Sequence, residues 1–171
     1  DDLAPVGRHW ATLLPDVIFA SPNAPERFSA GFGWQWFSLE EVTPENRPGR
    51  VRAARAAFDA ILSDVIAQHG FADRWQDVVL VGFSQGSIMA LDALASGRYP
   101  LAGVVAFSGR LAVDGELTPQ PHLPALLIHG QADEVIPWQE SESAAARLRA
   151  ALVPVEARFE PATGHTISAQ G

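Results

Sequence analysis

The segment that most restricts the fold of this chain is a short apolar run followed by a glycine-flanked serine. Residues 78–81 are Val-Val-Leu-Val, and residues 82–86 continue as Gly-Phe-Ser-Gln-Gly. A run of β-branched residues without polar alternation is typical of a strand buried on both faces, as in a parallel sheet covered by helices. The spacing of Ile88, Leu91 and Leu94 predicts a helix directly after the serine.

The same alternation of apolar strands and amphipathic helices continues along the chain. Further strands are predicted by apolar runs at residues 17–20, 103–107, 125–128 and 155–159, the last nearer an edge. Helices are predicted by apolar residues three and four positions apart over residues 49–69, 84–96 and 139–152. Strands and helices in succession indicate βαβ units, so we expect an α/β fold with a mostly parallel sheet and helices on both faces.

Composition narrows the class of protein. The 171 residues are 47% hydrophobic and 19% charged, which fits a single globular domain with a substantial core. A formal net charge of −8 argues against binding to nucleic acid and to an anionic membrane surface. No apolar stretch approaches the roughly 18 residues of a spanning helix, so stable membrane insertion is not expected.

Cysteine is absent from the sequence. Its absence excludes a disulfide scaffold, a thiolate metal site and a cysteine nucleophile. The first residues also lack the basic and apolar regions of a signal peptide. These observations fit a reducing compartment, and we expect a cytoplasmic location.

The pattern Gly-x-Ser-x-Gly at residues 82–86 is typical of a nucleophile elbow when a buried strand precedes it and a helix follows. Such a turn exposes the serine hydroxyl, and we expect Gly82 and Gly86 to be required because side chains there would collide with the strand and the helix. We predict Ser84 as the nucleophile and the main-chain N–H of Gln85 as one oxyanion donor at the positive end of the helix. A serine that only caps the helix is the alternative.

A serine nucleophile needs a base, because its hydroxyl is weakly reactive unaided. Catalytic groups of open α/β sheets lie at the carboxyl ends of strands, and of the five histidines only His129 and His165 are suitably placed. His129 ends a buried apolar run, so we expect it to pack near the site. His165 lies beside Gly164 in the loop after the last strand and is predicted to be the base, with a solvated loop histidine as the alternative.

The third group should orient the imidazole and stabilise its charged form. Asp133 lies in the loop that follows the strand at residues 125–128, and Glu134, its neighbour, should point elsewhere. The order Ser84, Asp133, His165 is the chain order of α/β-hydrolases. A simple turn aspartate is the alternative.

Together these motifs resemble those of the carboxylesterase, phospholipase and acyl-protein thioesterase family, the small α/β-hydrolases without a lid. The similarity spans nearly the whole chain and is carried by residues 82–86, by residues 129–137 (His-Gly-Gln-Ala-Asp-Glu-Val-Ile-Pro) and by residues 164–167 (Gly-His-Thr-Ile). The resemblance implies a catalytic triad of Ser84, His165 and Asp133. It also implies that Trp36 and Phe37 border the substrate groove, with aromatic side chains that only fill the core as the alternative.

The resemblance further predicts that residues 1–171 are a single α/β-hydrolase domain that is incomplete at both ends. Family members have a central strand before the position of Asp1, lying between the strands expected at residues 17–20 and 78–81. The loop after that strand supplies the second oxyanion donor. They also have a closing helix after His165. We therefore expect the working protein to extend beyond both termini.

The predicted function is a serine hydrolase that cleaves carboxylic esters, thioesters or lysophospholipids through an acyl-enzyme. The expected substrate is a small acyl ester or thioester. We expect no metal and no organic cofactor. The sequence leaves open whether the chain forms a homodimer. One alternative is a non-catalytic binding or scaffold protein on a hydrolase fold. Another is a hydrolase of a different substrate class, such as a peptidase or a cutinase-like depolymerase. A phosphate-binding protein is disfavoured because residues 82–86 lack the lysine of a P-loop and the third glycine of a dinucleotide motif.

Overall fold

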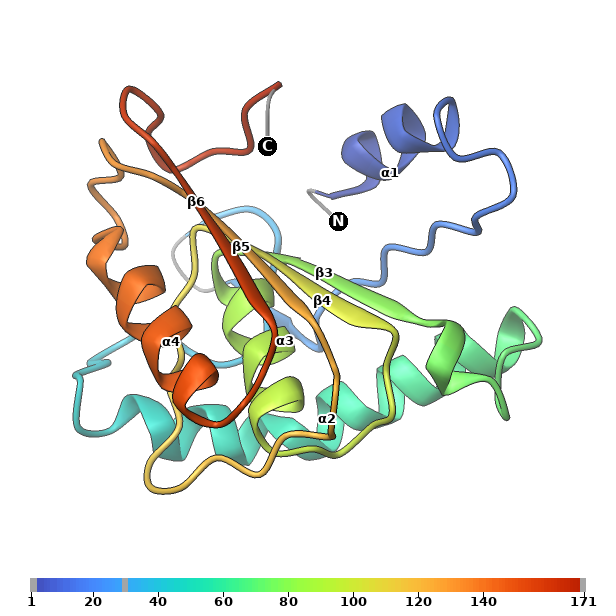
Figure 1. Ribbon diagram of the computed structural model, residues 1–171, viewed down its shortest axis with the longest axis horizontal. Helices are drawn as coiled ribbons and strands as arrows, with labels where there is room; N and C mark the ends of the chain where they lie inside the picture. The colour runs from blue at the N-terminus through green and yellow to red at the C-terminus, as the bar shows by residue number, and fades with distance from the viewer. Residues whose placement is uncertain (1–2, 29–30, 170–171) are drawn as a thin grey trace.

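A parallel β-sheet orders the part of the chain that the computed structural model describes, residues 3–28 and 31–169 (Figure 1). Its four strands lie side by side in chain order as β3 (Val79–Phe83), β4 (Gly103–Phe107), β5 (Ala125–Gly130) and β6 (Val155–Glu160). Every neighbouring pair is parallel. The carboxyl ends of all four strands therefore meet at one edge of the sheet, and the predicted parallel α/β architecture is confirmed.

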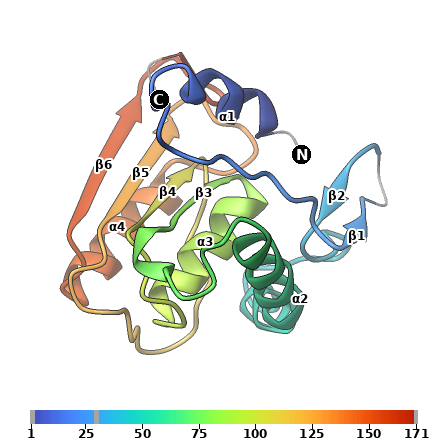
Figure 2. The ribbon, with the colours of Figure 1, turned by 90° about the vertical axis from the view of Figure 1, so that its right-hand side faces the viewer.

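Helices were expected on both faces of the sheet, but the three long helices of the described residues lie on one face (Figure 2). They are α2 (Arg47–Gln68), α3 (Gln85–Ala95) and α4 (Gln139–Ala150). α3 packs on β3 and β4 and is buried continuously over residues 87–95, while α4 contacts β5 and β6. α2 packs against α3 and does not need a wholly apolar surface, because only one of its faces is covered. The bounds agree with the predicted helices to within two residues at each end.

A buried carboxylate joins α2 to α3. The Asp92 side chain on α3 is 1% exposed, and both of its oxygens accept hydrogen bonds from Arg55 of α2, at 2.9 and 2.8 Å. Arg98 donates a further bond to the same carboxylate at 2.8 Å. A buried charge is tolerated only when it is paired in this way, so the network fixes α2 in place against α3.

The first helix lies apart from the other three, near the end of the sheet to which the strands point (Figure 2). This helix, α1 (Ala4–Ala11), directs Trp10 toward the end of β4, with its ring centroid 6.4 Å from that of Phe107. The ring of Phe19, in the segment that follows, lies 6.3 Å from the same tryptophan. The Phe107 ring is consequently buried, although it lies outside the core that α2, α3 and α4 form.

The prediction of a buried strand at residues 17–20 is wrong. The segment has no strand structure, and Val17 and Ile18 are 48% and 56% exposed. A strand needs a neighbouring backbone for its hydrogen bonds, and within the described ranges no segment pairs with this one. An apolar run alone therefore does not make a strand.

The expectation that β3 is buried on both faces fails on the face away from α3, where Val81 and Phe83 are only half-buried and Val79 is exposed. Among the described residues β3 lies at the edge of the sheet, and Val79 is 50% exposed. Leu80 and Gly82, which face α3, are buried as expected. The apolar run predicted the strand and its parallel pairing, but it could not predict how many neighbours the strand has.

The stretch between the first predicted strand and α2 is mostly irregular, as expected, but it contains a small ribbon. Strands β1 (Glu26–Arg27) and β2 (Trp34–Gln35) pair in antiparallel fashion. The guanidinium of Arg27 lies 3.9 Å from the ring centroid of Trp34 across this ribbon. After α2, a single turn of 3₁₀ helix, η1 (Trp75–Asp77), leads into β3.

The turn between β3 and α3 has the strained geometry that a nucleophile elbow requires. Ser84 has φ 51° and ψ −117°, a left-handed conformation that residues with a side chain rarely adopt. Its N–H donates to the carbonyl of Phe107 on β4 at 3.0 Å, and its carbonyl accepts the N–H of Ile88 at 3.2 Å. The serine is thus bonded to the sheet on one side and to the helix on the other, which prevents the turn from relaxing.

The two glycines of this turn differ in the space available for a side chain. A Cβ on Gly82 would overlap the main chain of Gly86 and Ser87, so the expected collision is confirmed there. At Gly86 the described residues leave open space where the methyl group of an alanine would lie, and the φ angle is not left-handed. The expectation that Gly86 is sterically required is therefore wrong: its main chain lies against Gly82, but the position of its missing side chain faces away from the described residues.

We expect Gly82→Ala to destabilise the fold and Gly86→Ala to be tolerated. Overpacking against the main chain should lower the free energy of unfolding by about 1–3 kcal/mol in Gly82→Ala. Gly86→Ala should change it by less than about 1 kcal/mol, and toward greater stability, because alanine favours the helix. Urea unfolding of the two variants beside the parent measures both values, and equal losses would contradict this account of the turn.

Candidate active site

Three loops bring the predicted serine, histidine and aspartate together at the carboxyl edge of the sheet. His165 Nε2 lies 3.0 Å from Ser84 Oγ, and His165 Nδ1 lies 2.7 Å from Asp133 Oδ2. A carboxylate only accepts hydrogen bonds, so Nδ1 carries the proton and Nε2 is free to accept the serine hydroxyl. The predicted order of contacts, from hydroxyl to imidazole to carboxylate, is the order observed in the structure.

Asp133 is buried and held by several donors. It is 8% exposed, and its Oδ1 accepts the main-chain N–H groups of Val135 and Ile136 at 2.8 and 2.9 Å. Burial by itself would raise the pKa of Asp133. The hydrogen bonds from His165, Ile136 and Val135 together outweigh burial and hold that pKa below its usual value. Asp133 therefore stays a carboxylate beside the imidazole, while the adjacent Glu134 is exposed as predicted.

His129 supports the loop that carries the acid. It is 1% exposed, with Nε2 2.8 Å from the Ile136 carbonyl and 3.1 Å from Asp133 Oδ2. Both neighbours are acceptors, so Nε2 carries a proton. The other ring nitrogen lies 2.7 Å from Ser141 Oγ on α4. The expectation that His129 packs near the site is confirmed, but its link to α4 had no signal in the sequence.

The loops that carry the acid and the base are bonded to each other. The N–H of Ala132 donates to the Thr163 carbonyl at 3.0 Å. The same carbonyl occupies the position where a Cβ on Gly130 would lie, so only glycine fits at the end of β5. The ring of Phe83 lies 4.8 Å from that of His165 on the strand side. The loop that carries the imidazole is therefore held by a main-chain contact, and Gly130 is a residue of the candidate site to which the sequence patterns assigned no role.

Gln85 begins α3, so its N–H is one of the first-turn donors that have no partner within the helix. The predicted substrate residues Trp36 and Phe37 lie close to its side chain. Trp36 is half-buried, with its ring centroid 4.9 Å from that of Phe58 on α2. Phe37 is 5% exposed and packs in the core. Its ring therefore has a packing role in the described structure, and Trp36 is the better placed of the two to meet a substrate.

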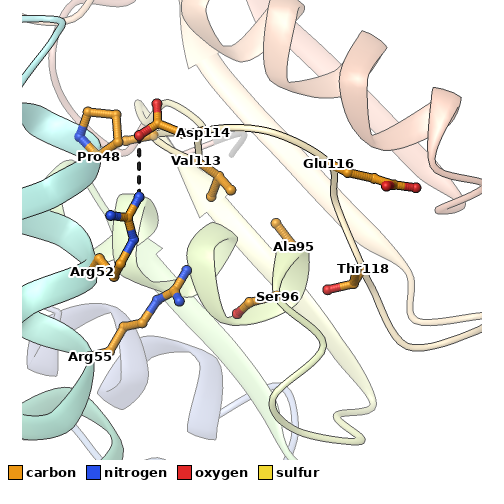
Figure 3. A pocket seen from close by; sticks show the side chains of 10 residues that line it. Pro48, Arg52, Arg55, Ala95, Ser96, Val113, Asp114, Glu116 and Thr118 are labelled. Atoms are coloured by element: carbon orange, nitrogen blue, oxygen red, sulfur yellow. Dashed lines mark hydrogen bonds and ion pairs between the residues drawn. The ribbon is translucent and has the colours of Figure 1, made fainter.

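The described residues lack the features of two other kinds of site. No three histidine, aspartate or glutamate side chains among them are grouped as metal ligands. Within the same residues, no helix combines the length and apolar character that crossing a membrane requires. A hollow of about 220 Å³ lies between α2, the far end of α3 and the segment around Asp114 (Figure 3). It is lined by Arg52 and Arg55 among others, and includes none of the triad residues.

Comparison with known proteins places this geometry in a family. The sequence profile of the phospholipase/carboxylesterase family matches residues 7–171. The esterase YpfH of Escherichia coli K12 is 32% identical over 162 residues, which cover 95% of this chain and 68% of the relative. Acyl-protein thioesterase 1 of Neurospora crassa is 26% identical over 191 residues, covering 96% of this chain and 77% of the relative.

A solved structure agrees with the sequence matches. The crystal structure of esterase PE8 superposes with a TM-score of 0.88 at 35% identity, covering 99% of this chain and 80% of that one. The four parallel strands, the covering helices and the turn at Ser84 are thus parts of an α/β-hydrolase fold. The chain belongs to the phospholipase/carboxylesterase family of α/β-hydrolases.

Proposed function

We propose that this chain hydrolyses carboxylic esters or thioesters through an acyl-enzyme formed on Ser84. The observation that carries the proposal is the continuous set of contacts from Ser84 Oγ to His165 to Asp133, at 3.0 and 2.7 Å. The names of the relatives, an esterase and an acyl-protein thioesterase, support ester or thioester chemistry. A binding protein without catalysis would not require a strained serine aligned with an imidazole and a carboxylate.

In the first half of the proposed reaction, Ser84 Oγ attacks the substrate carbonyl carbon while its proton passes to His165 Nε2. The carbonyl oxygen becomes an anion and meets the N–H of Gln85, where the positive end of α3 favours negative charge. His165 then gives the proton to the departing alcohol or thiol, and the bond to the leaving group breaks. The buried charge of Asp133 stabilises the imidazolium throughout this step.

In the second half, water replaces the leaving group. His165 takes a proton from the water as its oxygen attacks the acyl carbon. The bond between that carbon and Ser84 Oγ breaks, the proton returns to the serine, and the carboxylic acid is released. The described residues thus account for each proton transfer. Hydrolysis of substrates from other classes, peptides included, would be detected by assaying them beside the esters.

Replacing Ser84 by alanine should abolish the hydrolysis of p-nitrophenyl esters. Loss of a triad serine lowers kcat by roughly 10⁴–10⁶. A fluorophosphonate probe should label the parent protein and fail to label Ser84→Ala. Ser63→Ala, on the exposed side of α2, is the matched control and should keep both activity and labelling. A Ser84→Ala protein that keeps a tenth of the activity would refute the assignment.

Asp133 should also make stability depend on pH in acid. Because the pKa of Asp133 is lowered in the folded protein, its ionised form stabilises the fold above the unfolded pKa of about 3.9. This contribution is lost as the pH falls through the lower folded pKa. The stability difference between the parent and Asp133→Asn should therefore narrow steadily from about pH 5 toward pH 2.

Thermal unfolding of the parent and of Asp133→Asn at several pH values measures this difference in stability. Glu134→Gln is the matched control, since the exposed neighbour should show no such narrowing. A difference between the parent and Asp133→Asn that stays constant down to pH 2 would contradict the hydrogen-bonded carboxylate.

A further inference from the structure

The Gln85 side chain makes two contacts that the proposed reaction does not use. Its Oε1 accepts the main-chain N–H of Trp36 at 2.6 Å, and its Nε2 donates to the main-chain carbonyl of Phe37 at 2.8 Å. One partner is a donor and the other an acceptor, so only one orientation of the amide satisfies both. The side chain therefore bonds one main-chain group on each of two adjacent residues.

These contacts join segments far apart in the sequence. Trp36 and Phe37 follow β2 and belong to no strand themselves, so their peptide groups need partners from elsewhere. The Phe37 ring is fixed in the core, and the Trp36 ring packs edge-on against Phe58. At the next residue, the Ser38 carbonyl accepts a hydrogen bond from Arg50 at 2.8 Å. Gln85 is thus the anchor of this segment on the side of the nucleophile turn.

The segment meets the nucleophile turn through Gln85, whereas the base meets it from the loop after β6. Figure 2 shows β2 and α2 on one side of α3, and β6, which leads to His165, on the other. His165 must protonate the leaving group, so the leaving group departs on the β6 side. The acyl part of the substrate then extends toward α2 and Trp36. A half-buried tryptophan beside that path offers an apolar wall to an acyl chain.

Building on the proposed function, we infer that the Gln85 side chain is a positioning residue for acyl-chain selectivity. Through its two hydrogen bonds it holds the Trp36 segment against the nucleophile turn. The main-chain N–H of the same residue faces the oxyanion. One residue therefore fixes the distance between the carbonyl oxygen of the substrate and the wall that meets its acyl chain. Without the side-chain bonds, the wall should shift while the turn itself remains.

The test compares the parent with Gln85→Met, which is similar in length but makes neither hydrogen bond. The assay measures kcat and KM for p-nitrophenyl esters from acetyl to decanoyl, so that only the acyl chain varies. Losing the bonds should lower the octanoyl-to-acetyl ratio of kcat/KM by about tenfold, mainly through a higher KM for long chains. Gln120→Met is the matched control: Gln120 donates to the Gly97 carbonyl at 2.7 Å near the other end of α3. It should leave the ratio unchanged.

A second variant keeps the inference testable if Gln85→Met does not fold. Gln85→Glu keeps an acceptor for the Trp36 N–H but turns an oxygen toward the Phe37 carbonyl, so it should also lower the ratio. Trp36→Ala should lower the ratio in the parent and add little in Gln85→Met, because both changes act through the same wall. Full additivity of the two changes would overturn the inference.

The remaining outcomes separate this inference from the proposed function. If the parent hydrolyses the esters and both Gln85 variants keep its chain-length profile, the inference fails and the proposed function stands. A loss of equal size for every chain length would also overturn the inference, since it would assign the side chain to the turn alone. A parent protein that hydrolyses no ester and takes no fluorophosphonate label would refute the proposed function itself.

Discussion

The close approach of β3 to α3 is the constraint on which the rest of the site depends. Because Gly82 has no side chain, the main chain at Gly86 and Ser87 can pass directly against it. The chain reverses within a few residues, and Ser84 takes a left-handed conformation whose cost is on the order of 1–3 kcal/mol. Bonds to Phe107 on one side and Ile88 on the other stabilise it. The position of the hydroxyl is therefore set by the sheet and the helix together, and the other groups must reach it there.

The acid and the base meet this requirement through a shared set of loop contacts. The Thr163 carbonyl bonds the N–H of Ala132, and it lies where any residue larger than Gly130 would intrude. His129 bonds the Ile136 carbonyl, so the loop that carries Asp133 is held at both ends. A displacement of either loop would move the carboxylate and the imidazole together. The main-chain bond between the loops thus adds to the 2.7 Å contact between their side chains.

Local patterns in the sequence predicted those parts of the structure that depend on local physics. Periodicity located the three long helices, and the run before Ser84 identified the strand and the turn. The features that these local patterns missed depend on partners distant in the chain. Residues 17–20 have the composition of a strand but no neighbour to pair with among the described residues, and Val79 is exposed for the same reason. Gly86 looked as constrained as Gly82, because a motif records residue types and not the direction in which each Cα faces.

In the candidate site, too, some residues could be predicted from local patterns and others depend on distant partners. The three side chains that we propose to react could be named from motifs, since each chemical role restricts the residue type. The residues that hold them could not, because a buried histidine or a glutamine can bond many partners. Gln85 illustrates the point: its main chain was assigned from the helix terminus, whereas its side-chain bonds to residues 36 and 37 appear only once the chain has folded. The proposed reaction type thus follows from three short motifs, and the proposed selectivity from contacts between segments nearly fifty residues apart. Relatives with the same motifs can therefore share a mechanism and still differ in the substrates that they accept.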